Sequence, residues 1–226
     1  FKNKLSKWKI NLDNVHYIPN WGNLETIEFF NKKNTKFLIE NNLDPEKFYI
    51  MYSGTLALKH NPDLIVKIAE LNPDIGVIVV SVGSGFDKLM KKKDIPKNIH
   101  LFPIQPFNKI NEVLSSTDIF LAILNNDSSS FSVPSKILNY LCAGKAIILA
   151  APEKNLASKI ITFSNSGKIF DEKQINEIDN YIKFLKSNPN KIKELSHNAR
   201  KYAEENFDIK KISETFKKLI NEVSIN

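Results

Sequence analysis

The chain has 226 residues, of which 42% are hydrophobic and 25% are charged, and its formal net charge is +7. This balance predicts a soluble globular protein, because no apolar run approaches the ~18 residues of a membrane span. The single cysteine, Cys142, excludes an internal disulfide, which fits a cytoplasmic setting. Lysines are spread along the whole chain and Arg200 is the only arginine, which argues against a nucleic-acid-binding surface.

The first residues predict the end of a preceding domain. Residues 1–11 have the pattern of a helix end, and residues 15–18 that of a short strand. Residues 19–23 then break the pattern, as a crossing between domains would. We therefore expect residues 1–24 to be the tail of a missing N-terminal domain with its linker. Residues 25–226 are expected to form one domain, which opens with a weak helix over 34–41.

From residue 47 onward, apolar strands alternate with helices. Strands are expected at residues 48–52, 75–82, 99–102, 118–124, 146–151 and 167–170. Helices are expected at 61–71, 86–92, 108–116, 134–144, 155–163, 172–186, 189–206 and 209–223, with Asn61, Pro62 and Asp63 as a favourable cap, first residue and acidic residue. Continuously apolar strands indicate a parallel sheet that is buried on both faces. The predicted fold class is thus α/β: a doubly wound, Rossmann-like parallel sheet with helices on both faces and extra C-terminal helices.

The helix expected at Pro134 is the segment on which the functional interpretation depends. Proline suits the first helical position, which makes Val133 the N-cap, and valine has no oxygen to accept from the first-turn amides. Lys136 in that turn opposes the helix dipole unless an anion lies beside it. An anion site and a surface helix capped by water with Ser132 or Ser135 are both consistent with these residues.

Ligands of doubly wound sheets bind beyond the carboxyl ends of the strands. Four loops fall at this edge: 53–60, 83–85, 102–107 and 125–135. In the first of them, Gly54 lets the backbone approach a ligand closely. Lys59 and His60 lie just before a helix N-terminus, where they are placed to contact phosphate. The alternative is an ordinary strand-to-helix turn.

Other chemical signals are weak. Gly83 and Gly85 form half of a dinucleotide fingerprint, which a tight turn explains equally well. The histidines lack the spacing of metal ligands, and no nucleophile–base pattern is found, so we expect no metal and no cofactor. Two carboxylates lie near the loops: Asp118 opens a strand and therefore lies at the wrong end of the sheet, and Asp127 is interpreted as a loop residue.

Several blocks occur in a familiar order. They are Tyr52–Thr55, His60–Leu64, Val82–Gly85, Asn98–Phe102, Gln105-Pro106, Val133–Lys136 and Tyr140–Lys145. In this order they resemble the C-terminal, donor-binding domain of family 4 glycosyltransferases of the GT-B fold, in the subgroup that builds bacterial surface polysaccharides. The resemblance covers about residues 14–216. Residues 18–21 resemble the family's interdomain linker, and residues 200–207 resemble its closing helices, which cross back to the first domain.

The resemblance implies a retaining transfer of a sugar from a nucleotide-diphosphate sugar, UDP-linked, to a surface-polysaccharide or lipid-linked acceptor. Lys59 and Lys136 would neutralise the leaving diphosphate, so that no metal is required. The donor would be bound by Gly54, Thr55, His60, Gly83, Gly85, Phe102, Gln105, Ser132, Val133, Pro134, Ser135 and Asn139, with the ribose at Asn139. The implied partners are the missing N-terminal acceptor domain and, for the full-length enzyme, the inner face of the membrane.

The chain also departs from the family pattern. Two glutamates of many relatives fall at Phe131 and Asn139, and neither residue is acidic here. An arginine often found near Thr55 is absent, so the lysines would act as point charges without a bidentate fork. A non-catalytic nucleotide-binding module is therefore the alternative function. A nucleotide-sugar epimerase of similar architecture would need acidic catalytic residues that we do not find.

Overall fold

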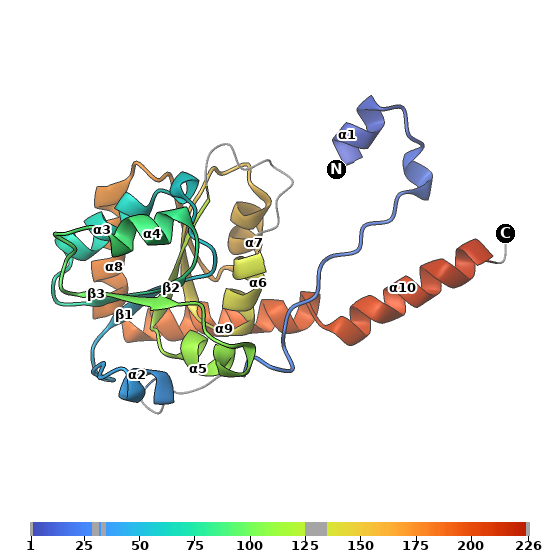
Figure 1. Cartoon of the computed structure of the whole chain (residues 1–226). Coiled ribbons are helices and arrows are strands. Elements are labelled where there is room, and N and C mark those ends of the chain that lie inside the picture. The colour runs from blue at the N-terminus through green and yellow to red at the C-terminus, as the bar shows by residue number, and fades with distance from the viewer. Residues whose placement is uncertain (1, 29–31, 33–34, 125–134, 225–226) are drawn as a thin grey trace.

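The computed structural model describes residues 2–28, 32, 35–124 and 135–224. Six parallel strands form one sheet in the order β3-β2-β1-β4-β5-β6 (Figure 1). The strands are β1 Tyr49–Ser53, β2 Gly76–Ser81, β3 Ile99–Pro103, β4 Ile119–Ile123, β5 Ala146–Ala150 and β6 Gly167–Phe170. The predicted doubly wound sheet is confirmed, and the order of the strands reverses between β1 and β4.

Helices cover both faces of the sheet. The α-helices are α1 Lys2–Lys7, α2 Lys36–Glu40, α3 Pro62–Leu71, α4 Ser84–Met90, α5 Ile110–Ser115, α6 Ser135–Cys142, α7 Leu156–Ser164, α8 Ile175–Ser187, α9 Pro189–Asn206 and α10 Ile209–Ser224. Ile50 and Tyr52 of β1 pack with α3, α4 and α8 on one face. Met51, between them, packs with α2, α5, α6 and α7 on the other. Successive residues of a strand point to opposite faces, so β1 is buried on both.

Three predictions about elements are wrong. Residues 15–18 lie in the described part of the chain and form no strand there. A strand needs a neighbour for its backbone hydrogen bonds, and this segment runs away from the sheet (Figure 1). The first helix ends at Lys7, before the predicted residue 11. Asn61 precedes α3 with a left-handed backbone, and its side-chain amide donates to Glu172 Oε2 at 3.2 Å instead of capping the helix.

Residues 22–27 are held where they contact the ends of two helices. The Gly22 N–H donates to Phe207 O at 2.9 Å. The Arg200 guanidinium donates to Ile27 O at 2.6 Å and to Cys142 O at 2.7 Å. Cys142 is the last residue of α6, so the Arg200 cation lies at a helix C-terminus, where the helix dipole favours positive charge. Cys142 itself is buried, as its place on the apolar side of the helix predicts.

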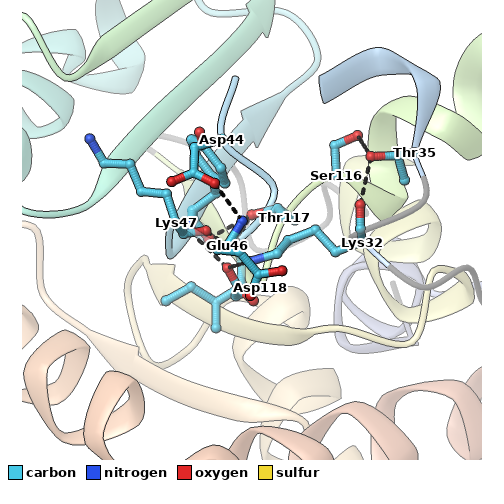
Figure 2. A network of polar contacts seen from close by, with 10 residues as sticks. Lys32, Thr35, Asp44, Glu46, Lys47, Ser116, Thr117 and Asp118 are labelled. Atoms are coloured by element: carbon cyan, nitrogen blue, oxygen red, sulfur yellow. Dashed lines mark hydrogen bonds and ion pairs between the residues drawn. The ribbon is translucent and has the colours of Figure 1, made fainter. Parts of the chain in front are cut away.

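The amino edge of the sheet is closed by polar contacts (Figure 2). Asp118 Oδ2, at the start of β4, accepts from Lys32 Nζ at 2.6 Å and from Tyr49 N at 2.7 Å. Lys32 also donates to Lys47 O at 2.8 Å. The Thr117 hydroxyl lies 2.8 Å from Tyr49 O. This confirms that Asp118 lies at the end of the sheet away from the ligand edge.

The C-terminal helix α10 presents an apolar stripe to solvent. Ile209, Phe216 and Ile220 are 41%, 49% and 60% exposed. Among the described residues, no helix has the length and apolar character that crossing a bilayer requires.

We expect Asp118→Asn to lower the free energy of unfolding by about 1–3 kcal/mol, because the Lys32 ammonium loses its counter-ion where the side chains are largely shielded from water. Urea denaturation measures this change. The matched control is Glu194→Gln, which removes the same charge from the more exposed pair with Lys191. We expect it to change stability by less than about 0.5 kcal/mol. Equal effects of the two substitutions would contradict the role assigned to Asp118.

Candidate functional site: a cationic cavity at the carboxyl edge of the sheet

A cavity of about 370 Å³ lies at the carboxyl edge, where the order of the strands reverses. It is lined by the ends of β1, β2 and β4, the loops after β1 and β3, one side of α5 and the first turns of α6. The residues are Ser53, Gly54, Thr55, Lys59, His60, Val80, Ile104, Gln105, Ile110, Val113, Leu114, Leu124, Ser135, Lys136, Asn139 and Tyr140. Of the four loops expected at this edge, 53–60 and 102–107 contribute to the cavity and 83–85 does not. Of the loop 125–135 only Ser135 is described, and it lines the cavity.

The charge of this cavity is positive. Lys59, His60 and Lys136 line it, and none of the described lining residues carries a carboxylate. The described chain also contains no group of acidic, histidine or cysteine side chains arranged to hold a metal ion. The positive charge of the described lining therefore suits an anionic ligand.

Lys136, in the first turn of α6, reaches across the end of β1. Its Nζ contacts the Tyr52 hydroxyl, lies 4.2 Å from the centre of the Tyr52 ring and 3.3 Å from Thr55 O. Burial lowers the pKa of Lys136 to about 8. The stem of Lys136 passes over Gly54, where a Cβ would lie 3.6 Å from Lys136 Cε. Gly54 has φ +118, a conformation that side chains rarely allow.

Tyr140 of α6 fixes the end of β1 from the other side. Its hydroxyl accepts from Ser53 N at 2.8 Å and donates to Ser53 O at 2.9 Å. Its ring stacks on Phe120 with the centroids 3.8 Å apart. A helix residue thus satisfies both backbone groups of the last residue of β1, which sets the distance between α6 and the loop that follows.

The loop after β1 is held by backbone bonds to β2 and α4. Gly54 N donates to Val80 O at 3.0 Å, and Leu56 N to Val82 O at 2.9 Å. Gly83 and Gly85 lie outside the cavity lining and pack against this loop. A Cβ on Gly83 would lie 2.9 Å from Leu56 O, and one on Gly85 would lie 2.8 Å from Ala57 O. These glycines allow α4 to approach the backbone of the loop.

His60 is the second basic group whose geometry is defined. Its Nδ1 accepts from Ala57 N at 3.1 Å, so the neutral ring carries its proton on Nε2 and can donate it. Burial, and then the Lys136 and Lys59 cations, hold the pKa of His60 below its ordinary value of 6.5. Lys59 is exposed at the rim.

The remaining predicted residues are distributed as follows. Gln105 lines the cavity and donates to Pro103 O at 2.9 Å, whereas Phe102 lies outside the lining and packs edge-on against Phe37. Asn139 lines the cavity, and its Oδ1 lies 3.4 Å from the Asn23 amide nitrogen. Ser132, Val133 and Pro134, and with them the predicted helix start and its cap, lie outside the described residues, as do Asp127 and Phe131.

Tyr52 and Tyr140 were not predicted from the sequence to lie at this cavity. Tyr52 ends a continuously apolar strand and Tyr140 lies on the apolar side of α6, so both read as ordinary core residues. The available signal was chemical: a buried tyrosine hydroxyl requires a hydrogen-bond partner. Two buried tyrosines near a loop and a lysine indicate a network of hydrogen bonds. The sequence does not show which groups bond to the two hydroxyls.

Comparison with known proteins gives one family match. The model of the family described as glycosyl transferases group 1 matches residues 33–205.

A curated relative covers nearly the whole chain. The chain is 24% identical over 224 residues to the putative colanic acid biosynthesis glycosyl transferase WcaI of Escherichia coli K12. The alignment covers 95% of this chain and 53% of WcaI. The chain therefore spans about half the length of this relative.

Solved structures share the fold. Anabaena HepE in complex with UDP superposes with a TM-score of 0.81 at 12% identity, over 98% of this chain and 61% of HepE. The C-terminal domain of the glycosyl transferase group 1 family protein LpcC from Francisella tularensis gives a TM-score of 0.64 at 16% identity, over 82% of this chain and 98% of that domain. These similarities confirm the α/β architecture with its C-terminal helices.

We expect His60 to titrate below 6.5 in an NMR titration of the imidazole signals, because burial and neighbouring cations disfavour its charged form. Removing one cation in Lys136→Ala should raise this pKa, since repulsion of the imidazolium falls. Lys67→Ala, on the exposed side of α3, is the control for loss of a positive charge and should leave the pKa unchanged. If the His60 pKa does not change in Lys136→Ala, the placement of the two groups in one cavity would be contradicted.

Proposed function

The chain belongs to the glycosyl transferases group 1 family, and from this premise we propose that it is the donor-binding half of a glycosyltransferase. The donor would be a nucleotide-diphosphate sugar, linked to UDP, and its diphosphate would occupy the cavity at the carboxyl edge. The observation that carries this proposal is the position of Lys136 in that cavity, with Lys59 and His60 beside it and no carboxylate in the described lining. The UDP in the Anabaena HepE complex supports the choice of nucleotide.

The chemistry follows from charge. When the sugar leaves, negative charge develops on the diphosphate, and fixed positive groups stabilise that charge more strongly in a partly shielded site than in water. Lys136 would supply the ammonium from α6, and neutral His60 would supply an N–H donor from the loop after β1. Each charged hydrogen bond contributes about 1.5–3 kcal/mol, whereas micromolar binding requires about 8 kcal/mol, so several groups must act together.

The acceptor site would belong to a separate N-terminal domain. The chain spans 53% of WcaI. Residues 2–24 and α10 extend from the body of the domain on the same side (Figure 1), and α10 carries the exposed apolar stripe described above. We propose that this stripe packs against the N-terminal domain, which would bind a surface-polysaccharide or lipid-linked acceptor. Retention of the anomeric configuration is part of the same proposal.

The alternative is a non-catalytic nucleotide-binding module. The absence of a carboxylate from the described lining favours it, as does Asn139 at a position where the family often has glutamate. Both the glycosyltransferase and the non-catalytic module require nucleotide binding, which calorimetry with UDP, UDP-sugars and GDP tests. Sugar transfer by the full-length protein, compared with its Lys136→Ala variant, separates them. Binding without transfer would favour the module, and no heat with any nucleotide would contradict both functions.

We expect Lys136→Ala to weaken UDP binding about 10- to 150-fold, which corresponds to about 1.5–3 kcal/mol for a lost charged hydrogen bond. Isothermal calorimetry measures the affinity. The control is Lys67→Ala, which removes the same charge from the exposed side of α3 and should change the affinity less than about 2-fold because salt screens distant charges. Unchanged affinity in Lys136→Ala would remove Lys136 from the site.

The affinity for UDP should fall as the pH rises through about 8, because burial lowers the pKa of Lys136 to about 8 and only the protonated amine attracts the diphosphate. UDP has lost its last phosphate proton below this range, since a terminal phosphate has a pKa of about 6, and its own titration does not interfere. Calorimetry over a pH series measures the midpoint. The decline should be absent in Lys136→Ala, and a decline that persists in that variant would assign it to another group.

A further inference from the structure

Tyr52 is a buried residue whose hydroxyl reaches the edge of the cavity. Its side chain is 0% exposed and packs on the face of the sheet covered by α3, α4 and α8. Lys136 comes from α6, which packs on the opposite face. The Lys136 side chain therefore crosses the end of β1 above Gly54 and meets the Tyr52 hydroxyl on the far side.

The hydroxyl makes two different contacts. It donates to Thr55 O at 2.8 Å, which commits its proton. Its oxygen therefore faces the Lys136 ammonium as an acceptor. The ammonium also lies over the face of the same ring, 4.2 Å from its centre, where the negative face of the ring attracts a cation. One side chain thus binds both the lysine and the loop that carries Lys59 and His60.

This contact has two consequences for a lysine that binds an anion. A half-buried amine loses hydration, which favours its neutral form, and an acceptor restores part of the stabilisation of the charged form. A lysine side chain also has about 2 kcal/mol of rotamer entropy, so holding it in place reduces what the ligand must order. Burial raises the pKa of the Tyr52 phenol far above its ordinary value, so the group remains a neutral hydroxyl.

We propose that Tyr52 is a positioning residue for Lys136: its hydroxyl holds the ammonium charged and in place across the end of β1 before the donor enters. Tyr52 does not touch the donor and acts through Lys136. The inference concerns the nucleotide-free site, and its relevance to sugar transfer rests on the proposed function.

The first test measures the lysine directly. In Tyr52→Phe the ring remains and the acceptor is lost, so the pKa of Lys136, followed by NMR of its Cε and Nζ signals without nucleotide, should fall below the wild-type value. Tyr49→Phe is the matched control, because it removes the hydroxyl of another buried tyrosine of β1 that lies at the amino edge of the sheet, away from Lys136. The control should leave the Lys136 pKa unchanged. A wild-type pKa in Tyr52→Phe, or the same shift in both variants, would overturn the proposal.

The second test measures binding. Tyr52→Phe should weaken UDP binding near neutral pH about 5- to 10-fold, on the scale of one hydrogen bond. In a Lys136→Met background the same substitution should have no further effect, because Tyr52 acts through the lysine. An equal loss in both backgrounds would indicate a merely structural tyrosine and overturn the proposal. If Tyr52→Phe shifts the Lys136 pKa but the wild-type protein binds no nucleotide, the positioning role stands and the proposed function fails.

Discussion

Strand β1 pairs with two parallel neighbours, β2 on one side and β4 on the other, and this pairing positions the helices and loops at both edges of the sheet. The carboxyl ends of parallel strands lie at one edge of the sheet. The connections that leave β1 and β4 at this edge go to opposite faces of the sheet. The helices α3 and α6 therefore separate at this point. The cavity lies in the space between them, so its position follows from the order of the strands.

The charges at the amino ends of β1 and β4 are balanced within the protein, whereas those described at the carboxyl ends are not. At the amino edge, Asp118 and Lys32 pair with each other and with backbone groups, and the charges are balanced inside the protein. At the carboxyl edge, lysines and a histidine gather without a carboxylate among the described lining residues. A charge that is balanced internally stabilises a fold. A charge that is met by neutral acceptors alone is available to a ligand, and this difference distinguishes the edge proposed to bind the donor from the structural one.

Neutral hydroxyls do the positioning at the carboxyl edge. Tyr52 and Tyr140 approach the end of β1 from opposite faces and bind, respectively, Lys136 with Thr55 O and both backbone groups of Ser53. A carboxylate in the place of the Tyr52 hydroxyl would neutralise Lys136 and compete with an anionic ligand. A phenol holds the cation without cancelling its charge, which is consistent with a site where no bidentate arginine is available.

The strands and the doubly wound class could be read from the sequence, because apolar runs and their spacing are local features. The same runs placed Asp118 before a strand, at the amino edge. They placed Lys136, Lys59 and His60 after strands, at the carboxyl edge. The prediction failed at residues 15–18, where strand-like residues have no strand to pair with, and at Asn61, whose amide bonds Glu172 instead of its own helix. Tertiary structure decided that Tyr52 meets Lys136, that Gly83 and Gly85 pack the loop, and that Phe102 lies outside the cavity. Each of these depends on contacts between segments distant in the chain, and residue patterns along a single segment carry no information about such distances.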